Sequence, residues 1–283
     1  MIRSVFVLAI ALAIATGDSD DTTPSFHRNG EFNRYYLYNS RVNGQQMSLT
    51  TQSSDIIQGV TTVVIVHGHE ESYQTSLNPD LRRELLESQN VNVIAVDWSI
   101  IASLSYSLAQ NSVLSVGEYM AGFLALQNIN PASLHLVGFN LGAHVVGVAG
   151  RRLGRVARIT ALDPSMSNVR LTSTDANYVE VIHTDGSSNG LGVQIGHADF
   201  FPNGGGSQPG CWGNDACSHN RAWLYFVASI RDNTFNARCC RTIRQKNLDR
   251  CRGAYLPMGG NELIKTPCSS GIYRVNTRSS YPY

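Results

Sequence analysis

Residues 134–150, LHLVGFNLGAHVVGVAG, combine a short apolar run, a turn bracketed by glycines and a segment of small residues at helical spacing. This pattern predicts a buried strand, a sharp turn and a helix that packs closely against a sheet. The turn is centred on Asn140, with Gly138 and Gly142 on either side. Glycine permits the close backbone contacts that such a turn requires. This stretch therefore indicates both the fold and the position of a candidate site.

Further apolar runs surround this stretch and alternate with segments of helical spacing. The runs predicted to be buried strands are 62–66, 91–96, 156–162 and 178–182, and an aromatic-rich strand is expected at 34–39. The predicted helices are 78–88, 112–128 and 220–230. The glycine-rich segment 186–210 has no clear periodicity and is predicted to be a long ordered loop. Strands that alternate with helices predict a mostly parallel sheet with helices on both faces.

Polar residues follow the ends of these strands, where ligands of parallel α/β sheets bind. The turn at 138–142 matches the G-x-S-x-G nucleophile elbow of α/β-hydrolases, with asparagine in place of serine. In that fold class the nucleophile precedes the acid and the histidine along the chain, and Asn140, Asp163 and His219 occur in this order. The oxyanion donors would be the backbone amides of His69 and Leu141. These residues form the candidate site.

Eight strings occur in an order that resembles the secreted pancreatic-lipase family, namely VIVHGH, VDW, HLVGFNLGAHVVG, ITALDPS, VIHTDG, HADFFPNGG, QPGC and CSHNRAW. That family includes triglyceride lipases, insect sn-1-specific phospholipases and the yolk proteins of flies. By this resemblance, Asp163 and His219 correspond to the triad acid and histidine, and Asn140 corresponds to the serine. His69 and Leu141 correspond to the oxyanion pair. The resemblance covers most of the chain and implies an α/β-hydrolase fold.

Several residues differ from the family pattern and limit which properties of the family are expected in this chain. The family's elbow reads G-H-S-L-G, whereas Phe139 and Asn140 hold the two central positions here, and His69 replaces the phenylalanine of the family's H-G-F. The segment that corresponds to the lid contains only residues 212–216, too few to cover an acyl pocket. Such a short lid is similar to that of the insect phospholipases. The C-terminal β-sandwich that binds colipase in the vertebrate enzymes is not expected, and neither is colipase dependence.

The chain of 283 residues begins with Met1, one basic residue at Arg3 and an unbroken apolar run at 5–15. A membrane-spanning helix needs about 20 apolar residues, so residues 1–17 are predicted to be a secretory signal peptide instead. Residues 18–283 are expected to form one domain of an extracellular protein without a transmembrane segment. The formal net charge of +1 and the lack of a basic block argue against nucleic acid and against an electrostatic membrane anchor.

The last third of the chain contains all six cysteines, Cys211, Cys217, Cys239, Cys240, Cys251 and Cys268. An even set of this kind fits an oxidising compartment. Because adjacent cysteines would need a strained ring to pair with each other, Cys239 and Cys240 are expected to find distant partners. The expected pairs are Cys211 with Cys217, Cys240 with Cys251 and Cys239 with Cys268. The spacing has no zinc pattern, so no metal and no cofactor are predicted.

The residue at the nucleophile position governs the functional hypothesis. A carboxamide has no hydroxyl or thiol group that His219 can activate. We therefore expect a secreted lipase-family protein without hydrolase activity, which binds a lipid or lipid-like ligand or serves as a storage or interaction protein. The alternative is an active lipase or sn-1 phospholipase, through unrecognised chemistry or a misread codon. His67, Asp97 and His183 are interpreted as structural, and the His69 side chain is a candidate ligand contact.

Overall fold

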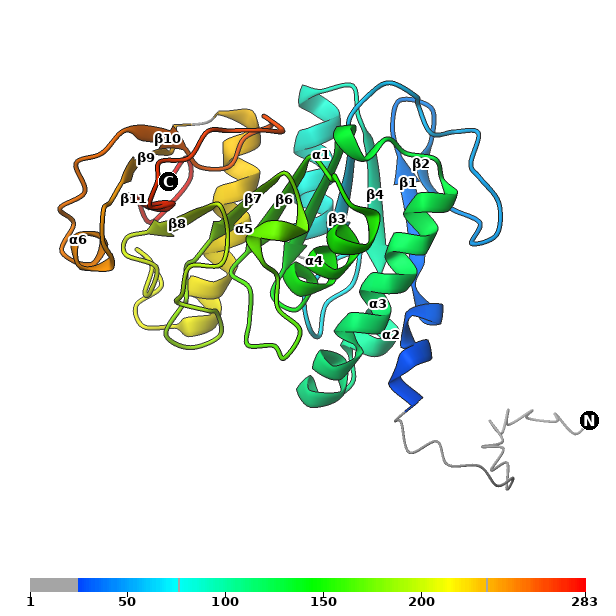
Figure 1. Cartoon of the computed structure of the whole chain (residues 1–283), viewed down its shortest axis with the longest axis horizontal. Helices are drawn as coiled ribbons and strands as arrows, with labels where there is room; N and C mark the ends of the chain where they lie inside the picture. Colours follow the sequence, from blue (N-terminus) through cyan, green and yellow to red (C-terminus); the bar gives the residue numbers. More distant parts are fainter. Residues whose placement is uncertain (1–24, 76, 233) are drawn as a thin grey trace, which may run out of the picture.

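The computed structural model describes residues 25–75, 77–232 and 234–283, and one mixed sheet runs through its centre (Figure 1). The strands of the described chain are β1 (Arg34–Tyr38), β2 (Asn43–Gln46), β3 (Thr62–Val66), β4 (Asn92–Asp97), β5 (Leu134–Phe139), β6 (Arg158–Leu162), β7 (Tyr178–Ile182), β8 (Ala198–Pro202), β9 (Asn236–Cys239), β10 (Tyr255–Pro257) and β11 (Ile272–Val275). Their order in the sheet is β10-β9-β11-β8-β7-β6-β5-β3-β4-β1-β2. The predicted signal peptide lies outside the described residues, and the domain boundary after residue 17 stays a prediction.

The centre of the sheet is parallel, as the sequence predicts. Strands β4, β3, β5, β6, β7, β8 and β11 run in the same direction along the sheet. Antiparallel pairs extend both sides, with β1 and β2 beyond β4 and with β9 and β10 beyond β11. Strand β3, with the sequence TVVIV, is buried along its whole length. Such a continuous β-branched run is typical of a parallel strand that is covered on both faces.

Helices cover both faces of this sheet (Figure 1). The helices of the described chain are α1 (Leu77–Ser88), α2 (Ser99–Ala102), α3 (Tyr106–Leu126), α4 (Gly142–Leu153), α5 (Asp215–Arg231) and α6 (Ile243–Asn247), with short 3₁₀ helices η1 (Ser25–Phe32), η2 (Pro131–Ser133) and η3 (Ser173–Asp175). Helices α3 and α4 pack on one face, and α1 and α5 pack on the other. Val64 and Val66 of β3 join the first core, whereas Val63 and Ile65 join the second. This alternation follows from the two-residue period of a strand.

The segment 186–210 differs from its prediction as a continuous loop, because it contains strand β8. The β8 sequence ADFFP is fully buried and pairs with β7 and β11. A carboxylate, Asp199, interrupts the apolar run, and the fold accommodates it with a 2.8 Å contact to His183 Nε2. The strand was missed because a charged residue in a short run hides the apolar pattern. The C-terminal strands β9, β10 and β11 were not predicted either.

Two helices begin earlier than the sequence analysis predicts. Helix α3 begins at Tyr106, before residue 112, and helix α5 begins at Asp215, before residue 220. The side chain of Asn214 accepts a hydrogen bond from the Cys217 backbone N–H at 2.9 Å, which is a favourable cap for α5. His219 consequently lies inside the first turns of α5, where a regular backbone fixes its position, and not at a junction between loop and helix.

All three predicted disulfide pairings are confirmed. Cys211 is bonded to Cys217, Cys239 to Cys268 and Cys240 to Cys251. The first closes the short segment before α5, and the other two tie the C-terminal part of the chain to the sheet. Within the described ranges, no helix combines the length and the apolar character that crossing a membrane requires.

Candidate functional site

Asn140 lies in the turn between β5 and α4, where the parallel strands end. Its backbone φ of +56° lies in the left-handed region, which asparagine adopts more readily than most other non-glycine residues. A Cβ atom on Gly138 would lie 2.3 Å from the Gly142 carbonyl oxygen, and one on Gly142 would lie 2.4 Å from the His67 carbonyl oxygen. Both positions therefore require glycine, and the strand, turn and helix predicted from the sequence are observed.

The Asn140 carboxamide makes two hydrogen bonds that span the candidate site. Its Nδ2 lies 2.9 Å from His219 Nε2, and its Oδ1 accepts the His69 backbone N–H at 3.2 Å. The opposite orientation of the carboxamide would set its amino group against the His69 N–H, which is also a donor. In the orientation that satisfies both partners, Asn140 donates to the histidine and accepts from the amide.

His219 lies between Asn140 and Asp163, as a triad requires. Its Nδ1 lies 2.5 Å from Asp163 Oδ2, so a neutral imidazole that accepts at Nε2 donates from Nδ1 to the carboxylate. The other oxygen of Asp163 accepts the backbone N–H groups of Thr184 and Asp185 at 2.7 and 3.1 Å. The structure therefore brings the three predicted residues into one hydrogen-bonded chain, although 56 residues separate the acid from the histidine.

Both predicted oxyanion amides lie beside Asn140. The Leu141 amide stands at the start of α4, where a helix leaves its first N–H groups without partners inside the helix. The His69 amide contacts the Asn140 oxygen directly. The neighbouring Gly68 N–H donates to Glu71 Oε2 at 2.8 Å, a brace for this loop that the sequence analysis missed. No local pattern marks Glu71, because its role depends on how the loop folds back.

The Phe139 ring lies against the histidine, with its centroid 4.6 Å from that of the His219 ring. Phe139 is almost completely buried, so this side of the imidazole is shielded from water. The sequence analysis identified Phe139 only as a departure from the family's elbow. The structure gives it a packing role, since an aromatic ring at this position restricts how His219 can move.

Two further histidines are buried away from the Asn140 side chain, and their contacts are structural. His67 Nε2 accepts the Trp98 backbone N–H at 3.2 Å, while Trp98 Nε1 donates to the His67 carbonyl at 2.9 Å. Asp97 Oδ1 lies 3.5 Å from the same His67 nitrogen. His183 lies 2.8 Å from Asp199 through Nε2, and its Nδ1 contacts a backbone carbonyl at 2.6 Å. These contacts brace the two loops that supply backbone donors to the site.

Three buried groups near the site have candidate metal-ligand atoms within 4.8 Å of one another, from Asp163, Asp185 and His219. Asp163 and His219 already bond to each other. Asp185 Oδ2 accepts two hydrogen bonds from Asn189, at 3.0 Å from its backbone and 2.7 Å from its side chain. Burial raises the pKa of Asp185. We therefore assign this cluster to the hydrogen-bonded chain of the site.

Three residues with exposed apolar side chains are linked to His69 directly or through Tyr106. Its Nε2 lies 2.8 Å from the Leu104 carbonyl, its ring meets the Tyr106 ring edge-on, and the Tyr106 hydroxyl donates to the Met166 carbonyl at 2.6 Å. The side chains of Leu104, Tyr106 and Met166 are 39, 37 and 53% exposed. We call these three residues the apolar rim. They were not predicted, because exposed apolar residues outside a strand or helix pattern contribute nothing to a core pattern.

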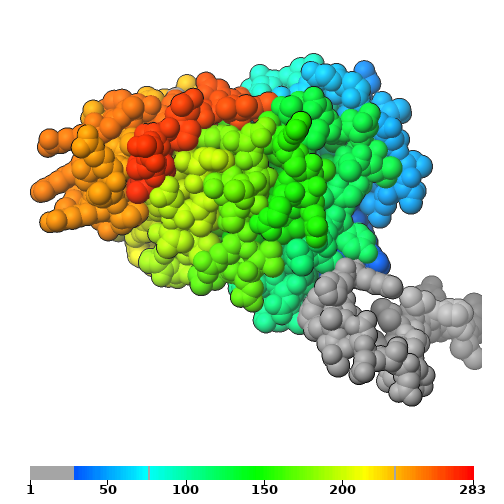
Figure 2. Space-filling model, viewed as in Figure 1, coloured from blue at the N-terminus to red at the C-terminus, as the bar shows by residue number. Residues whose placement is uncertain are grey.

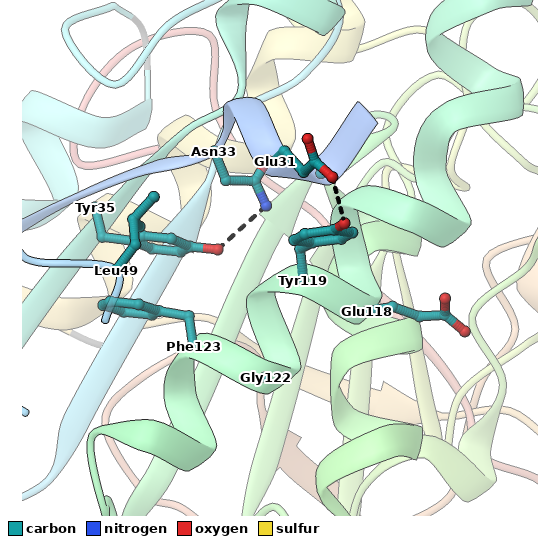
Figure 3. A pocket seen from close by; sticks show the side chains of 9 residues that line it. Glu31, Asn33, Tyr35, Leu49, Glu118, Tyr119, Gly122 and Phe123 are labelled. Atoms are coloured by element: carbon teal, nitrogen blue, oxygen red, sulfur yellow. Dashed lines mark hydrogen bonds between the residues drawn. The ribbon is translucent and has the colours of Figure 1, made fainter. Parts of the chain in front are cut away.

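A separate pocket of about 510 Å³ lies between η1, β1 and α3 (Figure 3). Tyr35 and Phe123 stack there with ring centroids 3.6 Å apart, and the Tyr119 hydroxyl donates to Glu31 at 2.9 Å. Asn33 Nδ2 donates to the Tyr35 hydroxyl at 3.1 Å on the same side. The residues that line this pocket include neither the three triad positions nor their bonded partners. The pocket is therefore distinct from the candidate site.

Comparison with known proteins places this site in a family. The family described as "Lipase" matches residues 21–255. Similar relatives include the human inactive pancreatic lipase-related protein 1, 34% identical over 260 residues, and the Cavia porcellus pancreatic lipase-related protein 2, 37% identical over 221 residues. The Myocastor coypus pancreatic triacylglycerol lipase is 33% identical over 273 residues.

These matches cover 77, 70 and 81% of this chain, and 56, 51 and 60% of the respective relatives. The chain therefore spans little more than half the length of the curated relatives it matches. The family match extends across the elbow, the acid and the histidine, and the observed fold is a mostly parallel sheet with helices on both faces. The chain belongs to the pancreatic lipase family and has an α/β-hydrolase fold.

Proposed function

We propose that this chain is a secreted member of the lipase family that does not hydrolyse esters and that binds a lipid or lipid-like ligand. The two hydrogen bonds of the Asn140 carboxamide carry this proposal. One engages the histidine that would activate a nucleophile, and the other engages an amide that would stabilise an oxyanion. Three disulfides and the predicted signal peptide support secretion, because such bonds persist in oxidising compartments.

The chemistry of the nucleophile position supports inactivity. Acyl transfer in this fold needs a hydroxyl oxygen that loses its proton to the histidine as it attacks. The nitrogen of Asn140 can donate a hydrogen bond to His219, but its lone pair is delocalised into the carbonyl group and does not attack an ester. Enzymes that lack a triad member retain roughly 10³ to 10⁴-fold acceleration over water, which is negligible beside a working lipase.

The oxygen of Asn140 adds a second obstacle. It accepts the His69 N–H at 3.2 Å, so an ester carbonyl would have to displace it to use the same donor. An oxyanion donor is effective when it is held ready for the charge that develops in the transition state. A donor that is already bonded to a neighbouring side chain has lost that advantage. The substitution therefore acts on two catalytic elements at once.

The ligand class is supported by the apolar rim and by the relatives. Leu104, Tyr106 and Met166 expose apolar surface beside His69, and exposed apolar surface of this kind favours a lipid-like ligand over a polar one. One relative is named a triacylglycerol lipase, and another is named an inactive lipase-related protein. Loss of hydrolysis with retention of the lipid-binding surface is consistent with both names.

An active ester hydrolase is the second candidate, and one observation favours it. The Asp163–His219 pair is complete, with 2.5 Å between Oδ2 and Nδ1, although an inactive protein has no catalytic need for it. The pair can also be explained by packing, since Asp163 is fully buried and its other oxygen holds two backbone N–H groups.

Labelling and rescue separate the two candidates. The wild-type protein should neither react with a fluorophosphonate probe at the elbow nor hydrolyse p-nitrophenyl butyrate. Asn140→Ser should restore the O–H that His219 can activate and raise hydrolysis by roughly 100-fold or more above wild type. The double variant Asn140→Ser/His219→Gln is the matched control and should lose that gain. Labelling or hydrolysis by the wild type at the level of Asn140→Ser would sink the inactive assignment.

Ligand binding needs its own measurement. Protein purified from its native secretion should carry lipid that organic extraction and mass spectrometry detect. Met166→Ser and Leu104→Ser should reduce the bound lipid, because they replace apolar contacts beside His69, whereas Leu126→Ser, which is also 39% exposed on α3, should not. A lipid-free extract would instead favour a storage protein without a ligand, whereas equal amounts of lipid in all variants would place the bound lipid away from the apolar rim.

A further inference from the structure

A strongly basic segment lies near one end of the sheet and follows helix α5 in the chain. Residues 238–252 include six of the 22 Lys and Arg residues of the chain but only one of its 21 acidic residues. The segment contains α6, which lies at the left end of the molecule in Figure 1, and the orange atoms of this part of the chain project there in Figure 2. The net charge of +1 for the whole chain conceals this local excess.

Three of these arginines converge on one groove of about 510 Å³. We call it the basic groove, and it is lined by Thr242, Arg244, Gln245, Leu248, Arg250 and Arg252. The Cys240–Cys251 disulfide closes the loop around it, and the Arg250 backbone N–H donates to the Gln245 carbonyl at 2.9 Å. The arginines are therefore held on a fixed backbone rather than on a loose tail.

Two other charged residues of the segment, Asp249 and Lys246, are already engaged. Asp249, its acidic residue, pairs with Arg274 at 3.0 Å and accepts Asn276 Nδ2 at 2.7 Å. Lys246 Nζ donates to the Gly204 carbonyl at 2.8 Å and lies over the Phe201 ring. Asp249 therefore has its partners outside the groove, and Lys246 stabilises the loop.

The groove arginines, in contrast, have no charged partner. Across the described ranges, the side chains of Arg244, Arg250 and Arg252 make no ion pair and no hydrogen bond, and all three are exposed. Each guanidinium presents a planar fork of N–H donors that matches the oxygens of a phosphate group. Three unpaired cations around one hollow therefore form a site for an anion.

Apolar groups in the same place indicate what carries that anion. Leu248, which lines the groove, is 49% exposed, and Ile243 on α6 is 43% exposed. A soluble polyanion would use the arginines but would gain nothing from these side chains, whereas the interface of a bilayer offers phosphates and apolar chains together. We propose that the basic groove docks this protein on lipid surfaces by binding the phosphate groups of anionic phospholipids.

This docking surface is independent of ester chemistry. The basic groove shares no residue with the triad positions or the apolar rim. The inference therefore does not rest on the proposed function, and an active or an inactive elbow is equally compatible with it. It differs from the prediction made from composition, which counts against an electrostatic membrane anchor, because the net charge of the whole chain cancels the local excess of basic residues at 238–252.

Co-sedimentation with vesicles tests the proposal on the full secreted chain. The wild type should bind phosphatidylcholine vesicles that contain phosphatidylserine and should not bind vesicles of phosphatidylcholine alone. The variant Arg244→Gln/Arg250→Gln/Arg252→Gln should bind the anionic vesicles about 100-fold more weakly, because each arginine near such a surface contributes about fivefold. Added salt should weaken wild-type binding. The matched control is Arg34→Gln/Arg41→Gln/Arg155→Gln, which removes the same charge elsewhere and should bind like the wild type.

A second variant distinguishes a lipid surface from a soluble polyanion. Leu248→Ser should weaken vesicle binding about fivefold through the lost apolar contact, and it should leave binding to dextran sulfate unchanged. Equal binding of the triple variant and the wild type would overturn the proposal. So would equal binding to anionic and neutral vesicles, or tight binding to dextran sulfate without binding to vesicles. Circular dichroism of each variant establishes that it is folded.

Discussion

Strands β5, β6 and β7 bury polar groups near both of their ends, but different interactions hold the two sets. Beyond the carboxyl ends, Asn140, His219 and Asp163 form a chain of hydrogen bonds. Closer to the amino ends, Arg158 at the start of β6 and Glu180 in the middle of β7 form a fully buried ion pair at 3.2 Å, and we call this part of the strands the ionic end. The first set preserves the shape of a site whose nucleophile is replaced, whereas the second fastens the chain to the sheet.

The ionic end joins segments that are distant in sequence. Arg158 Nη1 donates to the carbonyls of Gly260 and Glu262 at 2.9 and 2.7 Å, and Lys265 Nζ pairs with Glu180 at 3.1 Å. Burial alone would raise the pKa of Glu180, but the two cations hold it below its usual range. The loop around Gly260 is thereby bound to the start of the central strands.

The difference shows how a family member can carry asparagine at the nucleophile position and keep its fold. Replacing one partner at the ionic end would leave charge in a nonpolar environment, where it has no compensation. Replacing serine by asparagine at the other end left every polar atom of the Asn140 side chain with a partner. The buried charges therefore constrain the sequence more strongly than the residue that decides activity.

The largest expected effect is at the ionic end. Glu180→Gln should lower the free energy of unfolding by about 3–5 kcal/mol, because it leaves Arg158 and Lys265 buried without a counter-charge. Urea denaturation followed by tryptophan fluorescence measures the change. Glu87→Gln makes the same chemical change at an exposed pair with Arg231 and should leave the urea midpoint close to that of wild type. Equal midpoints for the two variants would remove the distinction between the ends.

An intermediate effect is expected from pH. Burial lowers the pKa of His144 to about 4, from its ordinary 6.5, and its Nε2 lies 2.7 Å from the Ser165 carbonyl, in the loop that follows Asp163. Because the unfolded chain takes up a proton first, this contribution to stability is complete above pH 6.5 and is lost as pH falls towards 4, by about 3 kcal/mol. His144→Gln should make the urea midpoint depend less on pH over this range. Part of the pH dependence will remain, because burial also lowers the pKa of His135. Parallel profiles for wild type and variant would contradict the assignment.

The smallest effect is expected at the elbow. Asn140→Ala should lower the free energy of unfolding by about 1–2 kcal/mol, since it removes two partly buried hydrogen bonds. Asn128→Ala is the matched control, because Asn128 has a φ of +55° but is exposed at the end of α3. Thermal denaturation should place the Asn140 variant below the control. If the control is equally destabilised, the loss of stability comes from the backbone conformation and not from the hydrogen bonds.

Local sequence was sufficient for the elements that bear the site. The β-branched runs predict β3 to β7, and the glycines at 138 and 142 predict the turn that presents Asn140, because these signals depend on neighbouring residues alone. The order of Asn140, Asp163 and His219 could be read with them. Local sequence could not reveal β8, because Asp199 becomes compatible with a buried strand only through its contact with His183.

The sequence by itself indicated the family and the fold class, and it placed asparagine at position 140, where the family's elbow has serine. It favoured one set of disulfide pairs, which the structure then confirmed. Tertiary structure decided what that replacement does, because the partners of the carboxamide, His69 and His219, lie 71 and 79 residues away in the chain. It also decided that Arg158 and Glu180 meet and that three arginines around α6 have no charged partner among the residues that the structure describes. The physical reason is the same in each case: periodicity and propensity act over a few residues, whereas the partner of a polar group is set by the packing of distant segments.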